Sequence, residues 1–103
     1  MTAKTKEDHL LFCFGEESGE IQQVLGKIGR FGMYDSNPHV KDSIVNFEHL
    51  TLEIHDLLAV YEMLCDEIDE ECVISRRLID KKKKRVKKYM KYARKRGKLE
   101  KDK

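Results

Sequence analysis

Apolar residues recur at helical spacing in three separate stretches of the chain. The first stretch predicts a helix from about Glu7 to Arg30. Gly15 and Gly19 lie inside it, and each costs about 1 kcal/mol relative to alanine in a helix, so they indicate close packing or a bend. Gly32 is expected to end the helix, because glycine is the usual residue after a helix C-terminus. The apolar positions of this helix are Leu10, Phe14, Ile21, Val24, Leu25 and Ile28.

Residues 32–45 separate the first stretch from the second. They contain the only proline and the sequence Asp-Ser-Asn-Pro, which is typical of turns, so a loop is expected. A second helix is expected to begin near Asn46, because asparagine is a favourable N-cap residue. The acidic segment 66–71 is expected to form a turn or the start of another helix. The apolar stripe of the second helix consists of Phe47, Leu50, Ile54, Leu57, Leu58, Tyr61, Leu64 and Ile68.

The third stretch predicts a helical region from about Cys72 to Arg96, with a break allowed near Asp80. Gly97 is expected to end it. Together, the three regions and the single proline predict an all-α protein. The apolar face of the third region is formed by Leu78, Ile79, Val86, Tyr89, Met90 and Ala93.

The length of 103 residues corresponds to one domain, and residues 1–7 and 98–103 are expected to be flexible tails. Three helices of this length carry more apolar stripe than one chain covers by itself. We therefore expect a helical bundle completed by a homodimer or a higher homo-oligomer.

The cysteines and the hydropathy bear on location. Cys13, Cys65 and Cys72 are odd in number and lack the Cys-x-x-Cys spacing, which favours reduced thiols in a cytoplasmic protein. The apolar cluster at residues 10–14 is too short for the hydrophobic region of a signal peptide. Because no stretch is long enough to cross a bilayer, we expect no membrane association.

Charge is distributed unevenly, although the net charge is only +2. From Asp80 onward there are fourteen Lys or Arg and three Asp or Glu, a net of +11. The preceding residues have a net charge of −9. This asymmetry allows two interpretations: acids that hold a metal beside bases that hold an anionic ligand, or a basic segment that binds nucleic acid by itself.

Two pairs of carboxylates interrupt the apolar stripes of the first two predicted helices. The pairs are Glu17 with Glu20, and Glu53 with Asp56, and their spacing of three residues places each pair on one helix face. At about 100° per residue, Glu17 and Glu53 fall inside the stripes, with the other two at the borders. Antiparallel packing would bring all four together. Because oxygen-only ligands select hard cations, such a site favours Mg²⁺, or Mn²⁺, over Zn²⁺.

Two short motifs surround these acids, and a basic segment follows them. Residues 16–23, Glu-Glu-Ser-Gly-Glu-Ile-Gln-Gln, with Lys27 and Arg30-Phe31-Gly32, resemble the first motif of the MazG-like all-α nucleoside triphosphate pyrophosphohydrolase family. Residues 53–60, Glu-Ile-His-Asp-Leu-Leu-Ala-Val, are similar to the second. Residues 80–96 look like the basic-aromatic helix that follows, particularly in small phage-encoded members. The resemblance covers about residues 9–96.

This resemblance implies an all-α NTP pyrophosphatase fold and a Mg²⁺-dependent cleavage between the α- and β-phosphates of an NTP or dNTP. It implies that Glu17, Glu20, Glu53 and Asp56 are the metal ligands. Among these, Glu20 and Glu53 are the candidate catalytic residues, with Glu20 orienting or deprotonating the attacking water.

Cations near the predicted apolar face are candidates for phosphate binding. Lys81, Arg85, Lys88 and Tyr92 are spaced four, three and four residues apart, so they form one row on the third helix, and Lys27 extends the Glu20 edge of the first. Three alternatives stay open. Acid pairs are also common on solvated helix faces, the basic segment could bind nucleic acid without catalysis, and the chain could bind nucleotides without turnover.

Overall fold

The computed structural model describes residues 3–102, and these form three α-helices and no strand. The helices are α1 (Lys6–Phe31), α2 (Asn46–Glu67) and α3 (Arg76–Lys95). The all-α prediction is therefore confirmed for the described part of the chain. The chain divides into two compact units between Cys72 and Val73, so the α1–α2 unit and the α3 unit are described separately.

Helix α1 has clear signals at both ends. The Thr5 hydroxyl accepts a hydrogen bond from the Asp8 amide at 3.1 Å, and the acids Glu7 and Asp8 lie in the first turn, where they favour the helix dipole. Gly32 ends the helix as predicted, with φ of 94° and its amide bonded to the Ile28 carbonyl. The helix thus begins one residue before, and ends one residue after, the predicted bounds.

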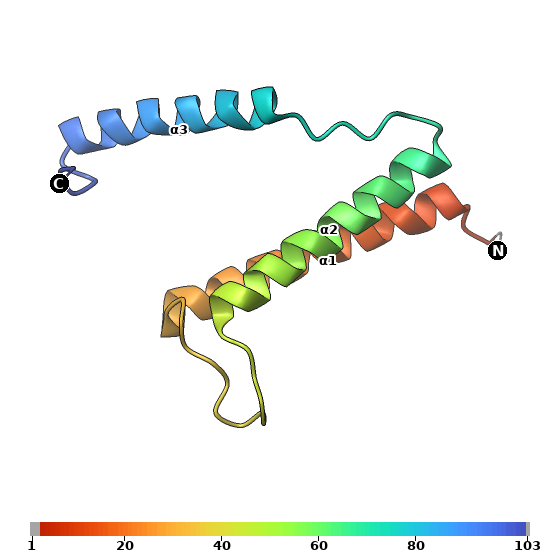
Figure 1. Ribbon diagram of the computed structural model, residues 1–103, viewed down its shortest axis with the longest axis horizontal. Coiled ribbons are helices and arrows are strands. Elements are labelled where there is room, and N and C mark those ends of the chain that lie inside the picture. Colours follow the sequence, from red (N-terminus) through yellow and green to blue (C-terminus); the bar gives the residue numbers. More distant parts are fainter. Residues whose placement is uncertain (1–2, 103) are drawn as a thin grey trace. The chain divides into compact units, whose positions relative to one another are not determined.

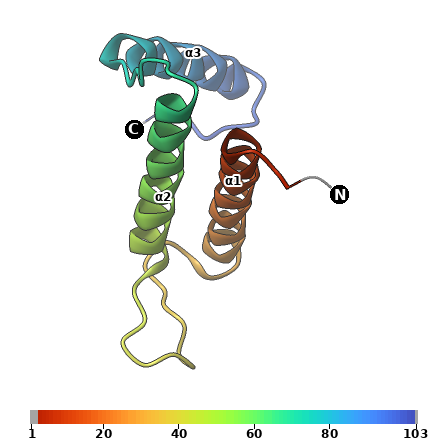
Figure 2. The ribbon, with the colours of Figure 1, turned by 90° about the vertical axis from the view of Figure 1, so that its right-hand side faces the viewer.

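Helices α1 and α2 lie side by side and antiparallel, joined by the loop of residues 32–45 (Figures 1 and 2). At the far end from the loop, Lys6 pairs with Glu67 at 3.4 Å. Along the seam, the rings of Phe14 and Tyr61 meet edge to face with centroids 6.4 Å apart. These contacts show that the N-terminal half of α1 lies beside the C-terminal half of α2, and this register determines where the acids of each helix lie.

The loop is attached to both helices by hydrogen bonds. Asn46 is buried, and its side-chain amide donates to the Gly32 carbonyl at 2.9 Å. The prediction that Asn46 caps α2 is wrong, because Val45 occupies the N-cap position and offers no side-chain cap. The amide satisfies a carbonyl that the end of α1 leaves without a helical partner. The N-cap prediction therefore missed a contact between segments fourteen residues apart.

The core of the α1–α2 unit is small. Its buried apolar side chains are Leu10, Val24 and Cys65, and many large apolar residues of both helices are exposed. A Cβ placed at Gly15 or Gly19 would have no atom within 4 Å apart from the neighbouring residues and backbone of its own helix. The expectation of close packing at these two glycines is therefore wrong within this chain.

Helix α3 begins at Arg76, because the Ser75 hydroxyl caps it by accepting from the Leu78 amide at 3.3 Å. It continues through Asp80, so the break allowed there does not occur. Gly97, with φ of 70°, follows the end of the helix. No helix in residues 3–102 is long and apolar enough to cross a bilayer.

The predicted tails lie partly outside the described residues, which exclude 1–2 and 103. At the N-terminal side, Lys6 and Glu7 are already helical. At the C-terminal side, the Lys98 amide donates to the Ala93 carbonyl at 2.9 Å. The side chain of Arg94 also donates to the carbonyl of Glu100 at 3.2 Å. Residues 6 and 7 of the first predicted tail therefore lie in α1, and Lys98 and Glu100 of the second are hydrogen-bonded to the last turn of α3.

Candidate metal centre

Three carboxylates from two helices converge on one side of the α1–α2 pair. Glu17 comes from α1, and Glu53 and Asp56 come from α2, one helical turn apart. One oxygen of each lies within 4.8 Å of the others. The antiparallel packing thus brings together three of the four acids that the sequence placed at the seam. Such a set offers only carboxylate oxygens, the ligand chemistry of hard divalent cations.

The burial of the acids follows the predicted positions on each helix. Glu17 and Glu53 are half-buried, and the Glu53 side chain is 13% exposed. Asp56 and Glu20 are exposed, as expected for residues at the border of the stripe. Each helix therefore presents one sheltered acid and one acid open to solvent.

Glu17 is the member whose protonation is most affected. Burial raises its pKa above the ordinary value of 4.5, and the negative charges of Asp56, Glu53 and Glu20 raise it further. Each of these causes disfavours the ionised form of the side chain. A bound divalent cation would reverse that balance by favouring the carboxylate. The carboxylates therefore suit a bound cation, and without a cation their mutual repulsion opposes ionisation of Glu17.

Glu20 lies outside the group of three whose oxygens are within 4.8 Å of one another. Its charge still contributes to the raised pKa of Glu17, so it lies beside the group. The structure thus separates the four predicted ligands into a converging set of three and one exposed neighbour. The role of Glu20 as a ligand or base stays a prediction.

A histidine that the sequence analysis did not single out contacts one of the three acids. His49 Nε2 lies 3.1 Å from Glu53 Oε1, and the histidine side chain is 32% exposed. The spacing of four residues on a helix was the available signal for this pair. His55 lies between Glu53 and Asp56 in the sequence but bonds instead through Nδ1 to the Thr51 carbonyl at 2.7 Å.

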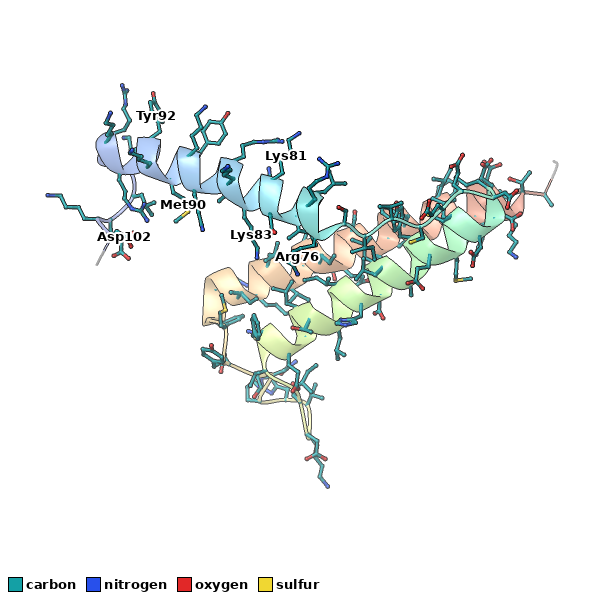
Figure 3. All side chains as sticks on the ribbon, turned by 45° about the horizontal axis from the view of Figure 1, so that its top comes forward. Arg76, Lys81, Lys83, Met90, Tyr92 and Asp102 are labelled. Atoms are coloured by element: carbon teal, nitrogen blue, oxygen red, sulfur yellow. The ribbon has the colours of Figure 1, made fainter. Side chains whose placement is uncertain are left out.

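The predicted phosphate-binding residues belong to both units. Lys27 is an exposed residue of α1. Lys81 and Tyr92 project from the same side of α3, away from Met90 and Lys83 (Figure 3), as the predicted row requires. All four predicted members on α3 are exposed, namely Lys81, Arg85, Lys88 and Tyr92. Their approach to the acids stays a prediction, because it depends on how α3 is placed.

Comparison of the chain with models of known protein families, with curated proteins and with solved structures gives no match. The resemblance to the MazG-like pyrophosphohydrolases therefore depends on the two acidic motifs and the basic helix. The converging carboxylates come from those same two motifs. The site is thus the feature from which a function is best argued.

Proposed function

We propose that the protein is a Mg²⁺-dependent nucleoside triphosphate pyrophosphohydrolase, which cleaves between the α- and β-phosphates to give a nucleoside monophosphate and pyrophosphate. The observation that carries this proposal is the group of Glu17, Glu53 and Asp56, with oxygens within 4.8 Å of one another. Its all-carboxylate composition favours Mg²⁺ or Mn²⁺. The MazG-like motifs that contain these acids support the same reaction.

In this proposal each acid has a stated role. Glu17, Glu53 and Asp56 hold the cation, and Glu53 is kept in position by His49. Mg²⁺ bound there would neutralise phosphate charge and would lower the pKa of a water that it coordinates. Glu20 is exposed beside the group, so it is free to orient the attacking water or accept its proton.

Cations complete the proposed site by binding the triphosphate. Their charge neutralises the phosphates as the negative charge of the leaving pyrophosphate develops. Tyr92 can hydrogen-bond to the nucleotide or stack on it. The cations proposed for phosphate binding are Lys27, Lys81, Arg85 and Lys88, and Tyr92 is the proposed aromatic contact.

We also propose that two copies assemble into a helical bundle. The α1–α2 unit buries only Leu10, Val24 and Cys65 among its apolar side chains. Leu11 and Leu25 of α1 are each about half exposed, at 52% and 50%. Because packing of an apolar face supplies most of a helix's stability, two helices with so small a core need a partner. A cytoplasmic location, in a bacterium or a phage-infected host, agrees with three cysteines that form no disulfide in the described residues.

The test of the proposed function is pyrophosphate release from a panel of NTPs and dNTPs with millimolar Mg²⁺, with EDTA as a control. The variant Glu53→Gln should fold but lose turnover, because it removes one anionic oxygen from the group. Glu62→Gln is the matched control, since Glu62 is an exposed acid elsewhere on α2. Full activity in Glu53→Gln would contradict the proposal.

A second candidate function is nucleic-acid binding through α3, and a specific observation favours it. Residues 73–103 carry sixteen Lys or Arg and three Asp or Glu, and every Lys and all but one Arg of α3 are exposed. Neutralising several phosphates would make affinity fall steeply with salt. A mobility shift with this salt dependence, together with no hydrolysis of any nucleotide, would support this function over the first.

A further inference from the structure

The α1–α2 unit has a pocket that the acidic group does not occupy. It has a volume of about 670 Å³, within the range of small-molecule sites. The end of α1, the loop of residues 32–45 and the start of α2 form its walls. In Figure 2 this loop extends from the paired helices at the end where α1 finishes and α2 begins.

Three features of the pocket wall favour a ligand that is partly flat and partly polar. Phe31 supplies an aromatic ring that is 62% exposed, and Pro38 and Ile44 add further apolar surface. Aromatic rings exposed in this way are surfaces on which nucleobases stack. Asp35 and Asp42 add carboxylates that can accept hydrogen bonds from sugar hydroxyls or base amino groups.

The charge in the pocket distinguishes it from the rest of the unit. Residues 1–72 carry sixteen Asp or Glu and only five Lys or Arg, so the surface as a whole repels anions. Two of those five cations, Lys27 and Arg30, line this one pocket. They form no ion pair within the described residues. With Asp35 and Asp42 the formal charge of the pocket lining is zero, whereas residues 1–72 as a whole have a net charge of −11, so an anionic group is repelled less in this pocket than on the rest of the unit.

The loop that forms the pocket is held in shape by hydrogen bonds. The side-chain oxygen of Asn37 accepts a hydrogen bond from the backbone amide of His39 at 2.9 Å. The backbone amide of Asn37 donates to the Ser43 hydroxyl at 3.2 Å. The backbone amide of Asn46 donates to the backbone carbonyl of Asp35 at 2.9 Å. A pre-formed wall reduces the entropy lost on binding.

One residue joins the pocket to the acids. His49 lines the pocket and lies 3.1 Å from Glu53 of the acidic group. A ligand in the pocket that extends past His49 therefore reaches the proposed metal ligands. We propose, on the basis of the proposed function, that this pocket binds the nucleoside part of a nucleotide substrate, with Phe31 stacking on the base and with Lys27 and Arg30 beside the phosphates.

The first test measures binding without catalysis. ¹⁵N-labelled protein is titrated with nucleoside monophosphates in EDTA, and ribose 5-phosphate serves as the probe that lacks a base. The proposal expects amide shifts centred on residues 31–46 with the monophosphates and much weaker binding of ribose 5-phosphate. Shifts centred elsewhere, or equal affinity for ribose 5-phosphate, would overturn it.

The second test uses a matched pair of variants. Phe31→Ala should weaken monophosphate binding about tenfold or more and raise KM for the triphosphate, by loss of stacking. Phe12→Ala is the control: it is on the same helix, is 58% exposed, and lies in a different hollow lined by Lys4 and Glu16. The spectrum of each variant reports whether it is folded, and the mapping on the unmodified protein needs no variant.

The outcomes separate this inference from the proposed function. Hydrolysis in which Phe31→Ala behaves like Phe12→Ala would overturn the pocket assignment and leave the enzyme proposal standing. Base-dependent binding at residues 31–46 without hydrolysis of any nucleotide would support the pocket and contradict the enzyme. In this way the two claims fail on different measurements.

Discussion

Glu17 is the residue at which burial and charge conflict most directly. Its pKa is raised by burial and by the charges of Asp56, Glu53 and Glu20. Replacing it with glutamine removes a charge that the metal-free fold disfavours. We therefore predict that Glu17→Gln raises the melting temperature of the metal-free protein at neutral pH.

The same substitution should damage function. Loss of a group that only orients a metal ligand typically costs 10- to 100-fold, so loss of a ligand itself should lower Mg²⁺-dependent turnover by about 100-fold or more. Thermal unfolding in EDTA and a turnover assay in Mg²⁺ check the two effects. A variant that is less stable and fully active would contradict both roles of Glu17.

The raised pKa of Glu17 also predicts how metal binding depends on pH. As pH rises above 4.5, the unfolded chain releases this proton before the folded chain does, so the metal-free protein loses stability through that window. At higher pH the ionised acids are available to a cation. Mg²⁺ should therefore raise the melting temperature more at about pH 8 than at about pH 5. An equal shift at both values would exclude Glu17 as a ligand.

Single residues also show how far sequence reasoning extends. The placement of Glu17 and Glu53 inside the helix stripes is confirmed by their half-buried side chains. The contact of His49 with Glu53 could be predicted from their spacing of four residues on one helix. The hydrogen bond from Asn46 to Gly32 could not be predicted, because it joins segments that are brought together only when the loop folds.

At the scale of elements, the helices were predictable because their signals are local. Thr5, Gly32 and Ser75 act within one turn of the helix ends that they define. The start of α3 was predicted too early, at about Cys72 instead of Arg76, because the Ser75 cap was not recognised in the sequence. The shape of the loop depends on bonds such as that from Asn37 to Ser43, which no periodicity indicates.

The turn from α1 into the loop depends on glycine at position 32. Gly32 has φ of 94° and ψ of 165°, a region that costs other residues about 1–3 kcal/mol. We predict that Gly32→Ala destabilises the protein by that amount in denaturant unfolding. Gly26→Ala is the control, because Gly26 is helical with open space around it and alanine should stabilise it by about 0.5–1 kcal/mol. Equal effects of the two substitutions would contradict the assigned strain.

Helix α3 allows the two candidate functions to be compared at equal charge. One triple variant replaces Lys81, Arg85 and Lys88 with glutamine, and the control triple variant replaces Lys83, Lys87 and Lys91, which lie on the same helix outside that row. If the first row binds the triphosphate, its loss should raise KM about tenfold or more, and the control should change KM little. Nucleic-acid binding that falls equally in both variants would indicate a general electrostatic role instead.

At the scale of the whole molecule, the small core is the main finding. Sequence reasoning recognised an excess of apolar stripe, and the exposed side chains of the α1–α2 unit agree with it. Which chain covers that surface cannot be deduced from one sequence, because periodicity gives a face but not its partner. For the same reason, the sequence does not predict where Lys81, Arg85 and Lys88 of α3 lie relative to the acids.

We predict that the protein assembles into at least two copies. Because one chain has a mass of 12.2 kDa, light scattering or native mass spectrometry should give about twice that value or a higher multiple. Replacing Leu25, which is 50% exposed, with glutamate should weaken the assembly if the apolar surface of α1 is its interface. A stable, active monomer at micromolar concentration would contradict the bundle.

The central claim is that the acids of α1 and α2 support cleavage between the α- and β-phosphates. The most direct measurement is a ³¹P NMR time course of one nucleoside triphosphate with the protein and Mg²⁺, repeated with EDTA. We predict that monophosphate and pyrophosphate appear together, and only when Mg²⁺ is present. Diphosphate with inorganic phosphate, or an unchanged spectrum for every nucleotide with folded protein, would contradict it.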